Sequence, residues 1–408
     1  MSTCQPSAVN KHARSAEALR HARAAIFGIF GINGFLLGMW VVHIPAIENR
    51  TGISHSTLGS LLLLLALGAI GGMQLSGPLA DRFGSRRMVI VAGLALSVAT
   101  FGPGTATGAW QLGLALVVFG FANGALDVSM NSQAVEVEQG YGRPILSAFH
   151  ALFSLGGVAG SLVGAATLAA GWAPATALLL AGGIGLVVVG VSSRRLMQGR
   201  PRDGRQVHTS ERAHGHFSPR VLALGGIAFV LMLSEGVAND WSSLQVKEHL
   251  DASDAVAALA FGAFSVTMTV GRFTADRVSA AVGPVAVVRY GTLLAAAGML
   301  LVVVSEILPL TIAGWALFGL GLSGCVPQIF TAAGNLGTGS AGTNMSRVVG
   351  LGYVGFLAGP ATIGWITRVI PLTAAMTVPL VCALIAAACA GVVRRTPPIA
   401  HRRHGGHS

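Results

Sequence analysis

Long apolar segments, each followed by a short polar stretch, recur along the whole sequence. Because roughly 20 mainly apolar helical residues are needed to cross the hydrocarbon core of a bilayer, each segment predicts one membrane-spanning helix. Only 10% of the 408 residues are charged, compared with roughly 25% in soluble domains. This composition excludes a soluble enzyme, a nucleic-acid-binding module and a secreted disulfide scaffold. Twelve spans are predicted, at residues 24–46, 57–79, 88–101, 110–133, 146–170, 174–191, 221–243, 255–273, 283–304, 308–333, 348–366 and 372–393.

The distribution of Lys and Arg predicts how these spans are oriented. With both termini in the cytoplasm, the inner segments hold 23 Lys and Arg residues and the outer segments hold three, Arg50, Lys247 and Arg368. Cytoplasmic loops carry the excess of positive charge, so we expect a multi-pass inner-membrane protein with both termini cytoplasmic. Tryptophans at the predicted outer span ends are typical of an aromatic belt; they are Trp40, Trp110, Trp172, Trp241 and Trp365.

The net charge of +11 does not indicate a nucleic-acid partner, because the basic residues lie in short loops between apolar runs. The first apolar segment is too long for a signal peptide and is followed by no evident cleavage site, so it is expected to remain as the first span. The four cysteines show neither a C-x-x-C pair nor a metal spacing. Histidines in the central loop and in the tail are explained by solvated basic segments. We therefore expect neither a metal nor a cofactor.

The chain divides into two halves that repeat. The longest polar segment, residues 192–220, predicts a cytoplasmic linker between the halves 24–191 and 221–393, with cytoplasmic tails at 1–23 and 394–408. Ala80-Asp81-Arg82 closes the second span of the first half, and Ala275-Asp276-Arg277 closes its equivalent. Two parallel halves around a central cavity are typical of transporters that alternate access. The predicted fold is an all-α integral membrane protein with twelve transmembrane helices in two six-helix halves.

The loop after the second span carries a specific motif. Gly77-Pro78-Leu79-Ala80-Asp81-Arg82-Phe83-Gly84-Ser85-Arg86-Arg87 resembles the signature loop of the major facilitator superfamily, and residues 271–277 form a weaker copy. Asp81, the acid of this motif, can lie against the positive end of a neighbouring helix. The resemblance implies that such contacts close the cytoplasmic side in the outward-facing state; the alternative is that the arginines serve only topology. The expected gate residues are Gly77, Asp81, Arg82, Arg86, Arg87, Asp276 and Arg277.

Ionisable residues inside the predicted spans are candidates for proton coupling, because a charge at bilayer depth costs at least ~2.5 kcal/mol. Asn123, Asp127 and Asn131 follow one another at four-residue intervals and share one face of the fourth span. This segment resembles the fourth span of the fucose-permease branch, which implies a role for Asp127 in proton coupling. His150 could lie at the same depth and exchange a proton with it. The alternatives are a structural acid and a histidine that only hydrogen-bonds the bundle.

In the second half, Glu235 is a candidate ligand for a proton or for substrate, and Asn239 follows it by one turn. Asp240 lies nearer the outer boundary, where an acid needs no function. In the first span, Asn33 and Trp40 share a face, and Trp40 is expected either to stack on a ring or to anchor at the interface. The apolar Val41 stands where the fucose-permease pattern has a second acid. Uncharged groups on one face of the tenth span complete the expected substrate site, namely Gln328, Thr331 and Asn335.

The sequence thus predicts a secondary active transporter for a small polar organic solute, sugar-like or a related metabolite, with proton coupling. No Walker A sequence is present, and no nucleophile–base arrangement indicates an enzyme. The alternatives are drug or metabolite efflux by proton antiport and, more remotely, a membrane sensor that does not transport. The expected partners are the solute, protons and lipid; the chain is expected to act as a monomer.

Overall fold

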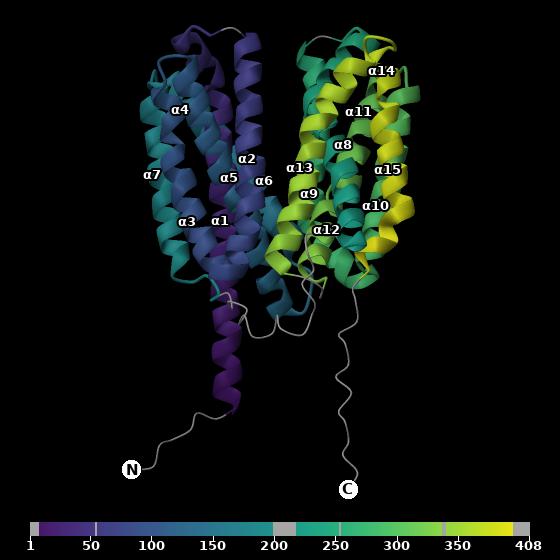
Figure 1. Ribbon diagram of the computed structural model, residues 1–408. Coiled ribbons are helices and arrows are strands. Elements are labelled where there is room, and N and C mark those ends of the chain that lie inside the picture. Colours follow the sequence, from purple (N-terminus) through teal and green to yellow (C-terminus); the bar gives the residue numbers. More distant parts are fainter. Residues whose placement is uncertain (1–7, 54, 199–217, 253, 337–339, 395–408) are drawn as a thin grey trace, which may run out of the picture.

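A computed structural model describes residues 8–53, 55–198, 218–252, 254–336 and 340–394, all of its regular elements there being helices. Figure 1 shows two bundles side by side, one built from α1 to α7 and the other from α8 to α15. The first bundle contains α1 (Ala8–Thr51), α2 (His55–Phe83), α3 (Ser85–Ala99), α4 (Phe101–Thr105), α5 (Ala109–Tyr141), α6 (Leu146–Ala169) and α7 (Pro174–Ser193). The second contains α8 (Pro219–Leu250), α9 (Asp254–Val282), α10 (Pro284–Val304), α11 (Leu308–Leu322), α12 (Cys325–Gly334), α13 (Ala341–Ile366), α14 (Leu372–Ala375), α15 (Thr377–Cys389) and the short 3-10 helix η2 (Ala390–Val393).

The predicted all-α membrane fold is confirmed. Among the described residues, eleven helical segments are long and apolar enough to span a membrane. The remaining predicted span, 255–273, lies within the 29-residue helix α9. The side chains of residues 254, 255 and 258 in this helix lie outside the described part of the structure. The third predicted span continues through α4 to Thr105, and α1 begins at Ala8, well before residue 24. The observed helices are longer because hydropathy marks only the apolar part of a helix, whereas the backbone hydrogen bonds of the helix continue into its polar residues.

Glycines allow the long helices of each bundle to pack closely. A Cβ on Gly34 of α1 would lie against the Phe153 carbonyl oxygen of α6 and 2.9 Å from the Gly157 nitrogen. In the second bundle, a Cβ on Gly355 of α13 would meet the Phe229 carbonyl of α8. Because lipid gives no hydrophobic force between helices, such close backbone approaches hold them together, and the high glycine content follows from this.

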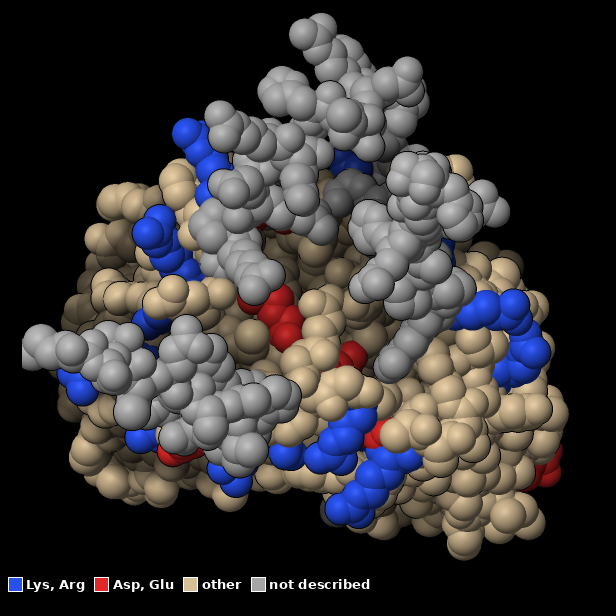
Figure 2. Space-filling view, turned by 90° about the horizontal axis from the view of Figure 1, so that it is seen from below, with Lys and Arg blue, Asp and Glu red and all other residues tan. Residues whose placement is uncertain are grey.

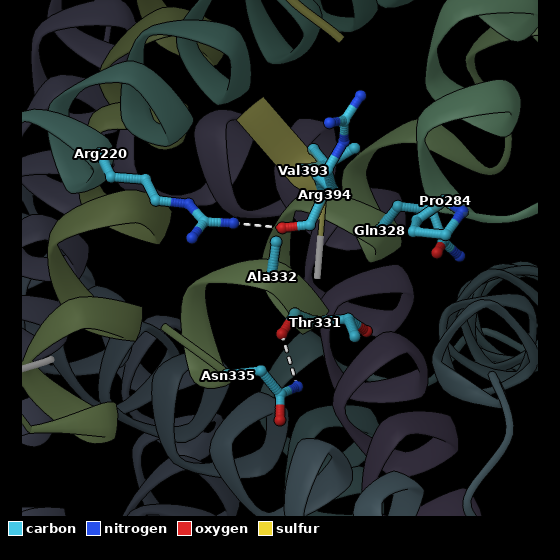
Figure 3. Close-up of a pocket in the computed structure, with 8 residues that line it drawn as sticks. All are labelled: Arg220, Pro284, Gln328, Thr331, Ala332, Asn335, Val393 and Arg394. Atoms are coloured by element: carbon cyan, nitrogen blue, oxygen red, sulfur yellow. Dashed lines mark hydrogen bonds between the residues drawn. The ribbon is translucent and has the colours of Figure 1, made fainter. Parts of the chain in front are cut away.

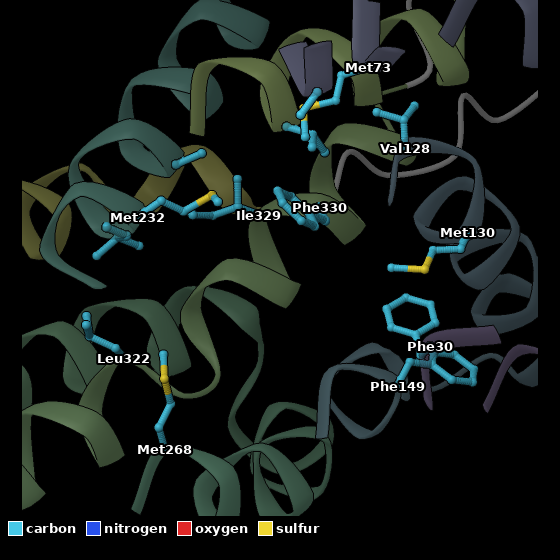
Figure 4. Close-up of a cluster of buried hydrophobic side chains, with 14 of the residues drawn as sticks. Phe30, Met73, Val128, Met130, Phe149, Met232, Met268, Leu322, Ile329 and Phe330 are labelled. Carbon is cyan, nitrogen blue, oxygen red and sulfur yellow. The ribbon is translucent and has the colours of Figure 1, made fainter. Parts of the chain in front are cut away.

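The two bundles meet mainly where α2 and α5 contact α13, where α6 contacts α9 and where α12 contacts α5 and α6. Apolar side chains of both bundles belong to one buried cluster, including Phe30, Met130 and Phe149 from the first and Ile329 and Phe330 from the second (Figure 4).

We call the end at which α1 begins and η2 ends the lower end, as it appears in Figure 1. Seen from below, it carries Lys and Arg side chains around its rim (Figure 2). Of the predicted linker and tails, residues 199–217, 1–7 and 395–408 lie outside the described part of the chain.

Candidate functional site

A buried chain of polar groups connects α5 to α6. The Asn131 amide nitrogen donates to the Asp127 carbonyl oxygen at 2.9 Å and lies 3.4 Å from Asp127 Oδ1. Its amide oxygen is 3.2 Å from His150 Nε2. Asp127 Oδ2 is buried and has no hydrogen-bond partner among the described residues. Asn131 therefore joins Asp127 to His150, which the sequence had placed at one depth but not connected.

An ion pair lies on the other side of the junction. Arg272 Nη2 of α9 is 3.2 Å from Glu235 Oε1 of α8, and the two side chains are 12% and 19% exposed. Arg272 Nη1 also donates to Ser154 Oγ of α6 at 2.7 Å, so the pair reaches into the first bundle. Since an ionised group at this depth is expensive unless it is paired, the Glu235 carboxylate is the natural counter-ion of this guanidinium.

Tyr353 of α13 lies within electrostatic range of both acids, Asp127 and Glu235, and His150 lies within range of Arg272. The cluster thus combines groups of α5 and α6 with groups of α8, α9 and α13. The sequence analysis missed Tyr353, Ser154 and the role of Arg272. An arginine within a predicted span was the available signal for Arg272; nothing in the sequence marked Tyr353.

Asn33, Asn123 and Trp40 lie inside the first bundle. Asn33 is 1% exposed, and its Nδ2 is 3.7 Å from the sulfur of Met130 on α5. The side-chain oxygens of Asn33 and Asn123 are buried without a partner among the described residues. Trp40 is 3% exposed, with its ring centroid 6.2 Å from that of Phe119. It is therefore a packing residue of this bundle rather than part of a lipid-facing belt.

Asn239 is half-buried near the upper end of α8, and Asp240 beside it is exposed. Their neighbour Trp241 donates its indole N–H to the Pro360 carbonyl of α13. The structure does not join these two residues to the central cluster by a hydrogen bond.

The polar face of α12 makes different contacts from those expected. Gln328 accepts a hydrogen bond from Ser279 at 2.8 Å, Thr331 donates to Glu138 at 2.8 Å, and Asn335 accepts one from Gln139 at 2.7 Å. The last two contacts join α12 to the lower end of α5. Gln328, Thr331 and Asn335 also line a small pocket with Arg220, Pro284, Ala332, Val393 and Arg394 (Figure 3). The structure thus places them at the lower end.

Two aspartates cap helices of the opposite bundle at the lower end. Asp81 accepts the backbone N–H groups of Gly342 and Thr343 at 3.0 and 2.9 Å, and the hydroxyl groups of Ser340 and Thr343. Asp276 accepts the backbone N–H groups of Ser147 and Ala148 at 3.0 and 2.8 Å. The first carboxylate thus satisfies the N-terminus of α13 and the second that of α6, where the helix dipole favours negative charge.

The remaining predicted gate residues do not cap a helix of the opposite bundle in the described structure. A Cβ on Gly77 would lie 2.6 Å from the Gly342 carbonyl oxygen, so this glycine permits the close crossing of α2 and α13. Arg82 lies over the ring of Phe83, and Arg86 donates to the Ser193 carbonyl, both within the first bundle. Arg87 and Arg277 are exposed.

Glu138 is a further residue that the sequence analysis missed. It is buried at the lower end of α5 and accepts the backbone N–H groups of Ile145 and Leu146 at 2.8 and 3.0 Å. Its other oxygen accepts the Thr331 hydroxyl, so one carboxylate caps α6 and contacts the second bundle. Within the described residues, no group of three or more His, Cys, Asp or Glu side chains is arranged to hold a metal ion.

Comparison with known proteins identifies relatives along most of the chain. A sequence model of the Major Facilitator Superfamily matches residues 26–238 and 224–407. An uncharacterized MFS-type transporter of Yersinia pestis is 33% identical over 376 residues, which cover 90% of this chain and 94% of that protein. Membrane protein MosC of Rhizobium meliloti is 33% identical over 363 residues, which cover 89% of this chain and 88% of MosC.

Solved structures share the fold. The transporter FucP in its outward conformation aligns with a TM-score of 0.75 and 14% identity, covering 91% of this chain and 98% of FucP. The proton:xylose symporter XylE, bound to 6-bromo-6-deoxy-D-glucose, aligns with a TM-score of 0.71 and 12% identity, covering 92% and 95%. At these identities the likeness concerns the fold alone.

Proposed function

The chain belongs to the major facilitator superfamily of transporters, and we propose that it is a proton-coupled secondary transporter of a small polar organic solute. The observation that carries this proposal is the polar cluster at the junction of the bundles, with Asp127 and His150 on one side and the Glu235–Arg272 pair on the other. A solute bound between the bundles would contact groups from both. Rocking of the bundles would then expose that solute to each side of the membrane in turn.

Asp127 is the proposed proton carrier. Its carboxyl group is 7% exposed, and one of its oxygens has no partner among the described residues. A buried carboxylate in this state is costly at bilayer depth, which favours the uptake of a proton. Asn131 holds Asp127 and His150 on either side of its amide, so His150 is positioned to sense or share that proton. The buried oxygens of Asn33 and Asn123 supply acceptors of the kind that bind hydroxyl or ammonium groups.

The basic rim of the lower end supports placing it in the cytoplasm. The chain is proposed to lie in the inner membrane and to act as a monomer. Asp81 and Asp276 hydrogen-bond across the bundles at that end, which supports the proposal that it is closed here and that the protein is in an outward-facing state. These two aspartates, with Gly77, would act as the cytoplasmic gate.

The first experiment is a thermal-stability screen of purified protein against sugars, sugar acids, amino acids, nucleosides and lipophilic drugs. A ligand that binds only the folded state raises the apparent stability by mass action. The hit is then tested in proteoliposomes carrying a pH gradient. We expect Asp127→Asn to retain solute exchange while losing at least tenfold in pH-driven accumulation.

Unchanged accumulation by Asp127→Asn would remove this carboxylate from the mechanism. Hits confined to lipophilic drugs, together with counterflow of a hydrophobic dye, would favour efflux by proton antiport instead. Saturable binding with zero flux would indicate a sensor.

A further inference from the structure

A polar connection runs from the central cluster to the lower gate along the contact of α6 with α9. On α9, Arg272 lies one helical turn from Asp276, the residue that caps α6. Arg272 pairs with Glu235 in its own bundle and donates to Ser154 in the other. Arg272 therefore connects the charge of Glu235 directly to the Arg272–Ser154 hydrogen bond, which joins the two bundles.

The internal repeat shows what is special about this contact. The offset that relates Asp81 to Asp276 also relates Gly77 to Arg272. At Gly77, the crossing of α2 and α13 depends on close approach of two backbones. At Arg272, a cation donates a hydrogen bond across the equivalent contact of α9 and α6. The two contacts between the bundles thus share a capping aspartate. They differ one helical turn away from it, where one has Gly77 and the other has Arg272.

The guanidinium is held in place by few groups. Its two terminal nitrogens bond to Glu235 and Ser154, and its buried Nε has no partner among the described residues. Removing the negative charge of Glu235 leaves a cation in a low-dielectric environment, which is strongly unfavourable. The cation then gains by turning toward water, and the bond to Ser154 breaks.

We propose that Arg272 is a positioning residue that couples the charge of Glu235 to closure of the lower gate. The inference rests on the proposed transport function: binding of solute or of a proton at Glu235 releases Arg272 from Ser154 and favours opening at the cytoplasmic side. The other charged or titratable groups near this pair are His150 of α6 and Tyr353 of α13, with Asp127 of α5 near Tyr353 and Asp276 one turn along α9. The test therefore changes the charge of Glu235 by substitution and not by pH.

The test measures the width of the lower end without any solute. Nitroxide labels are attached through Arg143→Cys and Ala281→Cys, two exposed positions near the lower ends of α6 and α9, in a background without the four native cysteines. Pulsed electron spin resonance then gives the ratio of open to closed forms. Ser154→Ala, Glu235→Gln and the double variant form a thermodynamic cycle. Ser132→Ala is the matched control, because its hydroxyl donates to the Val128 carbonyl within α5.

We expect Ser154→Ala and Glu235→Gln each to raise the open-to-closed ratio by about tenfold, as for loss of a hydrogen bond to a charged group. The double variant should add less than twofold to either single variant, since both act through Arg272. Fully multiplicative effects, or no effect of Ser154→Ala, would overturn the coupling. Transport by the same variants is assayed in parallel: a protein that transports no solute but shows the non-additive cycle contradicts the proposed function and leaves the coupling standing. Ordinary transport with a multiplicative cycle contradicts only the coupling.

Discussion

At the scale of single residues, Asn131 determines how the central cluster is organised. One amide contacts both Asp127 and His150, so a substitution at Asn131 removes a partner from both at once. We expect Asn131→Leu, which roughly preserves side-chain volume, to lower the stability of the folded protein by about 1–3 kcal/mol, because buried polar atoms lose their partners. It should also abolish pH-driven uptake. Thermal unfolding in detergent and proteoliposome transport measure the two effects.

The matched control for Asn131→Leu is Ser129→Ala on the same helix, whose buried hydroxyl donates to the Ala125 carbonyl one turn earlier. This variant should keep pH-driven uptake. Equal loss of uptake in both variants would mean that any polar change in α5 is damaging and that Asn131 has no special role.

At the scale of helices, glycine positions set the distance between neighbours. Gly34→Ala places a methyl group against the Phe153 carbonyl of α6, where the backbones of α1 and α6 already touch. We expect a loss of roughly 1–3 kcal/mol, the usual cost of overpacking a close contact. The melting temperature of the purified protein measures this loss. Gly183→Ala in α7, where a Cβ meets no atom within 4 Å, should leave the melting temperature unchanged.

Equal melting temperatures for Gly34→Ala and Gly183→Ala would mean that close helix packing is not the reason for a glycine at position 34. The contact of α1 with α6 would then not depend on it.

At the scale of the whole molecule, Asp81 and Asp276 hold the two bundles together at one end. Each carboxylate accepts at least two backbone N–H groups of a helix in the other bundle. We expect Asp81→Asn and Asp276→Asn each to raise the open-to-closed ratio, measured with the nitroxide pair at Arg143→Cys and Ala281→Cys, by about tenfold, since each loses charge-assisted hydrogen bonds. The double variant should exceed both, because the two contacts are separate.

Asp251→Asn is the control for these two variants. It makes the same chemical change, and Asp251 is exposed at the opposite end of the molecule. A lower end equally closed in all variants would show that the apolar cluster around Phe330, and not the capping aspartates, keeps the bundles together.

Much of this molecule follows from local properties of the sequence. Hydropathy depends on each segment alone, so it located the spans and, with the motif at Gly77–Arg87, led to the family. The four-residue spacing of Asn123, Asp127 and Asn131 placed them on one face, because residues four apart lie together on any α-helix. Helical spacing also grouped Gln328, Thr331 and Asn335, which line one pocket at the lower end; their role in substrate binding stays a prediction.

Partners across helices could not be predicted in this way. Periodicity shows which residues share a face, but it does not show which neighbour that face meets, because helix rotation and depth depend on packing of the whole bundle. Trp40 therefore packs on Phe119, whereas Gln328 of α12 bonds to α9 and Asn335, just after α12, bonds to α5. Tyr353 and Ser154 carry no unusual sequence signal. The sequence by itself thus predicted an all-α, multi-span transporter with acids inside its predicted spans. Only the tertiary structure decided that Asn131 joins Asp127 to His150 and that Arg272 joins Glu235 to the opposite bundle, because these contacts exist only once the helices have packed.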